Sequence, residues 1–90
     1  MGDFQTSGHQ AMISRIQTST FGITRLNAGY DERSVDDFLD EVVRIFAAGQ
    51  LPDPVELRDA TFSTTRLRPG YAIPDVRALL DEIAQYSEAS

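Results

Sequence analysis

Few residues in this 90-residue chain have side chains that could carry out chemistry. Carboxylates cluster at Asp36, Asp37, Asp40 and Glu41, and there is one histidine, His9, and no cysteine. Carboxylates spaced along a helix suit calcium poorly, because a calcium site needs a loop that folds around the ion. A single histidine cannot build a zinc site, and no nucleophile stands with a base partner. We therefore expect a solvated acidic helix face and no enzyme: no catalytic residue, no metal, no cofactor and no small-molecule substrate.

A second group of residues combines basic and apolar side chains. Arg25 precedes Leu26, and Arg66 and Arg68 flank Leu67, in stretches that contain no acidic residue. Two interpretations follow. In one, the leucines pack in the core and the arginines form weak ion pairs with acidic helices. In the other, each leucine with its arginines contacts an anionic membrane surface or a partner protein.

Composition limits the class of protein. Apolar residues make up 41% of the chain, as in a globular domain. The net charge of −6 argues against a nucleic-acid binder, which normally carries a basic face, and a small DNA-binding regulator is the weakest alternative. No apolar run approaches the roughly 20 residues that span a bilayer. The N-terminus lacks the features of a signal peptide, so we expect a cytoplasmic protein.

The arginine–leucine pairs occupy the same place in two copies of one sequence unit. A shift of 41 residues aligns Thr20–Val43 with Thr61–Ala84 without a gap, and 11 of the 24 positions are identical. Ordinary composition would give about one or two identities. This pattern indicates an internal duplication, with units at 1–49 and 50–90 packed as one domain.

Each unit predicts a short helix, an extended loop and a longer helix. In the second unit Asp53 is the expected N-cap and Pro54 the first residue of a helix that runs to about Asp59. Ser7 is the looser equivalent cap in the first unit, before a helix that contains Met12, Ile13 and Ile16.

The longer helices are amphipathic. Asp31 is the expected N-cap of the first, Gly49 its end, and Pro74 the opening of the second. Apolar residues recur with helical spacing: Val35, Phe38, Leu39, Val42, Val43 and Phe46 in the first, and Val76, Leu79, Leu80, Ile83 and Tyr86 in the second. The expected fold is all-α, with four helices in the order short-long-short-long, arranged as a pseudo-two-fold pair or as a homodimer.

A glycine precedes a tyrosine at the end of both loops. Gly29 and Gly70 are expected to adopt a positive φ, and the dipeptide Pro69–Gly70 fits the centre of a type II turn.

Aromatic residues flank each loop. Phe21 and Phe62 are expected to anchor it in the core, and Tyr30 and Tyr71 to pack on the long helix with their hydroxyl groups at the surface.

The repeated pattern F…TRL…GY…V…FLDEV resembles the N-terminal domain of the DivIVA family, bacterial proteins of the cell pole and septum. "TFSTTRLRPGYAIPDVRALLDEI" is similar to the version found in high-GC Gram-positive bacteria, and "TFGITRLNAGYDERSVDDFLDEV" carries the second half of the pattern more fully. The resemblance covers about 24 residues in each unit. It implies a helical domain whose loop, just before Gly-Tyr, touches the membrane with an apolar and a basic side chain. It also implies that the loops of two chains cross.

Carried over to this sequence, the resemblance places the loop tips at Leu26 with Arg25, and at Leu67 with Arg66 and Arg68. The sequence departs from the family in three respects. Leucine replaces the membrane-inserting aromatic residue of better-known members, and the loop is about two residues longer. The long parallel coiled coil that follows in family members is not expected here. One duplicated chain could supply both halves of the crossed pair. The expected function is a localisation or interaction module at the cytoplasmic membrane face, related to cell division or polar growth. The alternative is a protein–protein adaptor without membrane contact, whose partner is another protein or a second copy.

Overall fold

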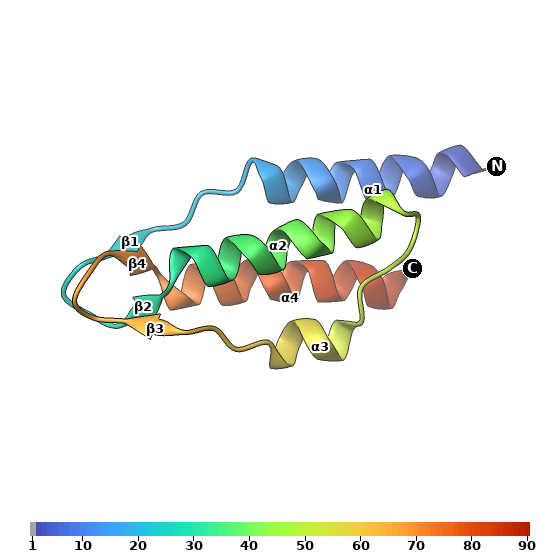
Figure 1. The fold of residues 1–90 in the computed structure, drawn as a ribbon. Helices are drawn as coiled ribbons and strands as arrows, with labels where there is room; N and C mark the ends of the chain where they lie inside the picture. The colour runs from blue at the N-terminus through green and yellow to red at the C-terminus, as the bar shows by residue number, and fades with distance from the viewer. Residues whose placement is uncertain (1) are drawn as a thin grey trace.

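The computed structural model describes residues 2–90, with side chains from Gly8 onward. The chain forms an elongated molecule of 50 × 23 × 16 Å, with the helices along its length and two long loops at one end (Figure 1). Its elements are the helices α1 (Gly2–Gln17), α2 (Glu32–Ala47), α3 (Pro54–Asp59) and α4 (Ile73–Ala89), and the strands β1 (Ile23–Thr24), β2 (Gly29–Tyr30), β3 (Thr64–Thr65) and β4 (Gly70–Tyr71).

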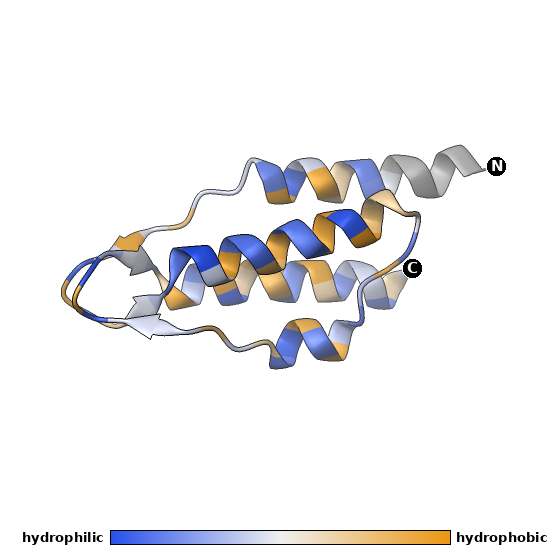
Figure 2. Cartoon of the chain, in the orientation of Figure 1, coloured by the Kyte–Doolittle hydropathy of each residue, from blue (hydrophilic) through white to orange (hydrophobic). Residues whose placement is uncertain are grey.

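One hydrophobic core draws on all four helices. Helix α1 packs against α2, and α3 packs against α4. Apolar residues line one stripe of each long helix while hydrophilic residues cover the rest (Figure 2). The stripe predicted in α4 is confirmed at its four aliphatic positions, and in α2 Phe38 and Val43 are only partly buried. The buried apolar residues are Met12, Ile13, Ile16, Val35, Leu39, Val42, Phe46, Leu57, Val76, Leu79, Leu80, Ile83 and Ala84.

The predicted helix ends are mostly confirmed. Asp31 Oδ2 accepts a hydrogen bond of 3.1 Å from the backbone N–H of Ser34 at the start of α2. Asp53 caps α3, because its Oδ1 accepts a hydrogen bond of 2.9 Å from the backbone N–H of Val55. Helix α2 ends at Ala47 with Ala48 as its C-cap, and the predicted Gly49 follows, where its φ of +80° allows the chain to reverse. The end is a Schellman motif, with hydrogen bonds from Gly49 N to Phe46 O (2.9 Å) and from Gln50 N to Ile45 O (3.1 Å).

The first helix differs from its prediction. Helix α1 has 16 residues and begins at Gly2, so the order is long-long-short-long. Ser7 lies inside this helix and is not its cap, and its side chain is outside the described ones. Serine favours N-caps, but such a local preference does not by itself decide where a helix begins.

The prediction of four helices is confirmed, but the all-α class holds only in part, because the two extended loops form a small antiparallel sheet. The strand order is β1-β4-β2-β3. Ile23 and Thr24 pair with Tyr71 and Gly70, and Tyr30 pairs with Tyr71 at the centre of the sheet. Two-residue strands have too little alternation to be recognised in the sequence. They pair only because the fold brings the two loops together.

The sheet links the two halves of the chain symmetrically. Strands β1 and β3 begin 41 residues apart, as do β2 and β4, and so do helices α2 and α4. In each half the first strand pairs with the second strand of the other half. Two further equivalent hydrogen bonds of 2.7 Å run from Asp31 N to Ser63 O and from Ala72 N to Gly22 O. The two loops therefore cross within a single chain, and their tips lie at the same end of the molecule (Figure 1).

The two glycines of the sheet have a different role from the one predicted. Among the described residues Gly49 is the glycine with a positive φ, so neither Gly29 nor Gly70 requires a left-handed backbone. Both lie where strands approach closely. A Cβ on Gly70 would lie 2.8 Å from the carbonyl oxygen of Tyr30, and a Cβ on Gly29 would lie 2.9 Å from that of Tyr71. Glycine is needed for space between strands, and the turn interpretation is wrong.

Replacing Ser87 by alanine is expected to raise the free energy of unfolding by about 1 kcal/mol. The Ser87 hydroxyl is buried and has no hydrogen-bond partner in the described part of the chain, and such a group costs about 1–3 kcal/mol. The measurement is chemical denaturation. Ser14→Ala, at an exposed position of α1, is the control for the higher helix propensity of alanine. A Ser87→Ala protein less stable than the wild type would contradict the expectation.

Candidate functional site: the loop tips and the acidic groove

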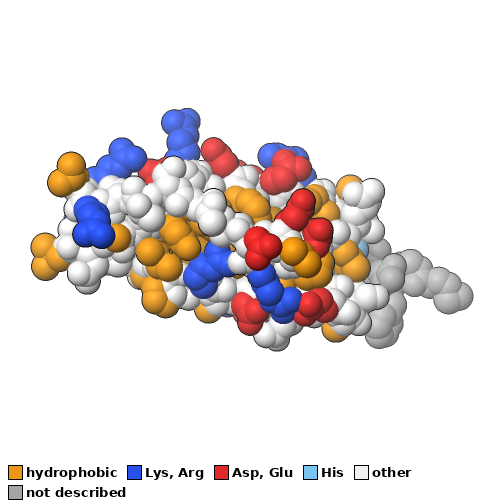
Figure 3. Space-filling model, turned by 90° about the horizontal axis from the view of Figure 1, so that it is seen from below, with side chains coloured by type: hydrophobic (Ala, Val, Ile, Leu, Met, Phe, Trp, Pro, Cys, Tyr) orange, Lys and Arg blue, Asp and Glu red, His pale blue; other side chains and the backbone are white. Residues whose placement is uncertain are grey.

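The leucine at each loop tip is fully solvent-exposed. We use "loop tips" for residues 25–28 and 66–69, which lie beyond the strands. The Leu26 side chain is 95% exposed and that of Leu67 is 102% exposed, so the prediction that they pack in the core is wrong. The strands end before these residues, and no helix extends far enough to cover them (Figure 1). Figure 3 shows hydrophobic side chains projecting from this end, with basic side chains close by.

The arginines of the tips differ in their partners. Arg68 Nη2 forms an ion pair of 2.8 Å with Asp31 Oδ1, as the pairing interpretation expected. Hydrogen bonds from Ser34 lower the pKa of Asp31, and Arg68 lowers it further. The stability gained is therefore present at neutral pH and is lost as the pH falls through that lowered pKa. No ion pair in the described part of the chain includes Arg25 or Arg66.

Aromatic pairs hold the base of each loop. The rings of Phe21 and Tyr71 lie 4.9 Å apart, and those of Tyr30 and Phe62 lie 5.0 Å apart. All four side chains are partly buried against the core, as expected. Each pair joins a phenylalanine of one half to a tyrosine of the other. The aromatic residues therefore fasten the crossed loops to the helices.

Next to one aromatic pair lies a groove that the sequence did not reveal. It has a volume of about 590 Å³ and runs between the end of α1 and the side of α2. Its lining is mixed: five residues are apolar or aromatic and five are polar, and Asp36 and Asp40 contribute carboxylates. We call it the acidic groove. Its lining residues are Ile16, Gln17, Ser19, Thr20, Phe21, Asp36, Leu39, Asp40, Val43 and Tyr71.

One acid of the groove is fixed in position. The Tyr71 hydroxyl donates a hydrogen bond of 2.9 Å to Asp36 Oδ1. Burial raises the pKa of Tyr71 to about 12, and this hydrogen bond adds to the effect. Tyr71 therefore remains a donor at any physiological pH and holds Asp36 beside the groove. This carboxylate was expected to be only part of a solvated helix face.

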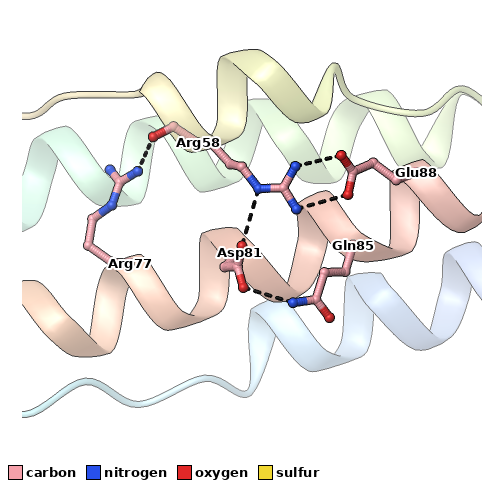
Figure 4. Close-up of polar contacts among 5 residues, drawn as sticks. All are labelled: Arg58, Arg77, Asp81, Gln85 and Glu88. Atoms are coloured by element: carbon pink, nitrogen blue, oxygen red, sulfur yellow. Dashed lines mark hydrogen bonds and ion pairs between the residues drawn. The ribbon is translucent and has the colours of Figure 1, made fainter.

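The equivalent surface of the second half is occupied by two arginines (Figure 4). Arg77 Nη1 donates a hydrogen bond of 2.6 Å to the carbonyl oxygen of Ala60, and Arg77 Nη2 donates one to the carbonyl oxygen of Arg58. Arg58 in turn forms ion pairs of 3.2 Å with Asp81 and 2.6 Å with Glu88. These hydrogen bonds raise the pKa of Arg58 and lower that of Glu88. The end of α3 is thus tied to α4 by guanidinium groups.

In the first half these two arginines are absent. A shift of 41 residues places Gln17 at the position of Arg58 and Asp36 at that of Arg77. The carbonyl oxygens of Gln17 and Ser19, which correspond to the two acceptors of Arg77, receive no hydrogen bond from the described part of the chain. The acidic groove therefore presents the carbonyl oxygens of Gln17 and Ser19 and the carboxylate of Asp40 without a donor from the described part of the chain, beside Asp36, which accepts from Tyr71. That arrangement suits a guanidinium group, which donates in a planar fork and is always charged.

A metal-ligand cluster and a membrane-spanning helix are both absent from the described residues. In the part of the chain that the structure describes, no three metal-ligating side chains come together. Across the same residues, every helix is too short or too polar to cross a bilayer.

Comparison with protein-family models, with curated proteins and with solved structures finds no match to this chain. The resemblance to the DivIVA family therefore rests on the residues quoted above.

Proposed function

We propose that this chain is a non-enzymatic, DivIVA-like localisation module of bacterial cell division or polar growth whose paired loop tips contact the anionic cytoplasmic membrane surface. The observation that carries the proposal is the placement of two exposed leucines, Leu26 and Leu67, at one end of the molecule. Arg25 and Arg66 stand beside them, whereas the acidic residues lie on the helices or, as Asp31 and Asp53 do, at helix N-caps. The crossing of the two loops within one chain supports the resemblance, because crossed loops are what the family implies.

The energies favour weak attachment by a single chain. Burying a leucine gives about 1.5–3 kcal/mol, and an arginine near an anionic leaflet adds about 1 kcal/mol. Two leucines and two arginines therefore give at most about 5–8 kcal/mol, before any cost of ordering the loops. At about 1.4 kcal/mol per decade of affinity, stable attachment requires several copies or a larger partner.

Co-sedimentation with vesicles of phosphatidylglycerol and phosphatidylcholine, at low and high salt, tests this proposal. Leu26→Ala with Leu67→Ala is expected to reduce binding at least about tenfold, the loss of about 1.4 kcal/mol. Val55→Ala is the matched control, because Val55 is 62% exposed and lies on α3. Salt should weaken wild-type binding by screening the arginines. Absence of binding by the folded wild type, or equal loss in the control, would contradict membrane contact at the tips.

The acidic groove favours a second function, that of an adaptor for a partner protein. The observation is that the chain's own Arg58 and Arg77 fill the equivalent surface of the second half. A partner segment with an arginine between apolar residues could donate hydrogen bonds to the free carbonyl and carboxylate oxygens. Its apolar residues would cover the apolar side chains of the lining. This function does not depend on the membrane.

A titration with the peptide acetyl-Leu-Arg-Leu-amide, followed by NMR of the backbone amides, tests the adaptor function. Shifts are expected at the groove residues, and the peptide with citrulline in place of arginine should cause none. Asp36→Arg should abolish them, because the new arginine reproduces the contacts of Arg77. Asp37→Arg changes the net charge equally at an exposed position outside the groove. Equal weakening by both variants would mean that only net charge attracts the peptide.

A further inference from the structure

We infer that Arg58 and Arg77 act as a built-in ligand that closes the second groove, so that each chain offers one arginine-binding groove, on the side of α1 and α2. The inference rests on the proposed adaptor function and goes beyond it, because it assigns the number of sites and the side on which a partner binds. It concerns an asymmetry between two halves whose strands and following helices begin 41 residues apart.

The two surfaces are built from equivalent residues. A shift of 41 positions pairs nine lining residues of the acidic groove with residues of the second half, and pairs the tenth, Tyr71, with Tyr30 of the first half. Five of the ten pairs are identical, and three exchange residues of similar or smaller size. The identical pairs are Thr20/Thr61, Phe21/Phe62, Leu39/Leu80, Asp40/Asp81 and Tyr71/Tyr30; the other three are Ile16/Leu57, Ser19/Ala60 and Val43/Ala84.

The remaining two pairs decide whether the surface is open. They are Gln17/Arg58 and Asp36/Arg77. In the second half Arg77 donates to the carbonyl oxygens of residues 58 and 60, and Arg58 bonds Asp81, the equivalent of Asp40. The same acceptors in the first half are residues 17, 19 and 40, which line the open groove. Two arginines thus occupy in one half the acceptors that are free in the other.

A tethered arginine competes strongly with a partner. Its effective concentration is in the millimolar range or above, because it is held on the same chain. Arg58 is further held by three hydrogen bonds to Asp81 and Glu88, of 3.2, 2.6 and 2.8 Å. A partner would have to displace these contacts to enter the second half. It is therefore directed to the first half, and each chain recruits one partner in one orientation relative to the loop tips.

Exchanging the two deciding pairs tests the inference with the same arginine and citrulline peptides. The closed variant carries Gln17→Arg and Asp36→Arg, and the opened variant carries Arg58→Gln and Arg77→Asp. In the wild type, citrulline-sensitive shifts should be confined to the acidic groove, which consists of first-half residues and Tyr71. The opened variant should add a second set at residues 60–62 and around Asp81, with an affinity within about tenfold of the first. The closed variant should show neither set.

The design separates the inference from the function on which it rests. Wild-type shifts at residues 60–62 and around Asp81, or an opened variant that folds without gaining the second set, would overturn the inference and leave the adaptor function intact. Absence of citrulline-sensitive shifts in the wild type would remove the adaptor function and the inference with it. If the chemical shifts of the groove residues change with protein concentration in the absence of peptide, the groove binds a second copy of the chain. That result would contradict the proposal that a partner protein binds there. Circular dichroism checks folding, and Arg77→Ala, which keeps the ion pairs of Arg58, is the milder opening variant.

Discussion

Replacing Gly70 by alanine is expected to lower the free energy of unfolding by about 2–3 kcal/mol. The new Cβ would lie 2.8 Å from the carbonyl oxygen of Tyr30 and 2.8 Å from Cγ2 of Thr65. The carbonyl belongs to the paired strand and cannot move without separating β2 from β4, so the cost is that of overpacking. For a chain of this size, each kcal/mol corresponds to about 4–8 °C in Tm. Thermal and chemical unfolding measure the loss.

A double-mutant cycle identifies the cause. Thr65→Ser removes the Cγ2 contact and leaves the contact with the carbonyl, so it should restore part of the lost stability in the Gly70→Ala background. Gly49→Ala provides the opposite case, because Gly49 has a φ of +80° with nothing near its Cβ position. It should cost about 1 kcal/mol through backbone strain alone. If the Gly70→Ala protein were as stable as the Gly49→Ala protein, strands β2 and β4 could separate enough to accommodate the new Cβ at little cost. That result would contradict the expected overpacking.

The helices were predictable because their signals are local. Asp31 and Asp53 are N-caps in the sequence and in the structure, and the apolar spacing of α2 and α4 marks the residues that are buried. The length of α1 was not predictable from Ser7, since its first residues have no apolar stripe. A helix without such a stripe gives no periodic signal.

The sheet and the groove were not predictable because both depend on contacts between the halves. The repeat predicts a positive φ at Gly29 and Gly70, and that prediction is wrong, because the glycines allow strands 41 residues apart in sequence to approach closely. Leu26 and Leu67 were compatible with both packing and exposure until the sheet placed them beyond the helices. The groove had one signal in the sequence, the exchange of an acid for an arginine between Asp36 and Arg77. Its meaning required the structure of both halves.

Replacing Phe46 by alanine is expected to cost about 3–5 kcal/mol, the usual range for a buried phenylalanine. The Phe46 side chain is 1% exposed, and its ring lies 5.4 Å from that of His9 and 5.8 Å from that of Tyr86. It therefore joins α2 to α1 and α4 at the end of the molecule opposite the tips. A domain of this length has a total stability of about 5–13 kcal/mol, so the variant should be largely unfolded at moderately raised temperature.

Two further variants distinguish the effect of the buried volume of Phe46 from the effect of its aromatic contacts. Phe38→Ala, on the same helix but only partly buried, should cost about 1–2 kcal/mol because less apolar area leaves the core. Phe46→Leu keeps most of the volume and should cost less than Phe46→Ala. The hydrogen bond of 3.3 Å from His9 Nδ1 to the Phe46 carbonyl oxygen involves the backbone and can form in all of these proteins. If Phe46→Leu were as unstable as Phe46→Ala, the specific aromatic contacts with His9 and Tyr86, and not the buried volume, would hold α1 to the rest of the molecule.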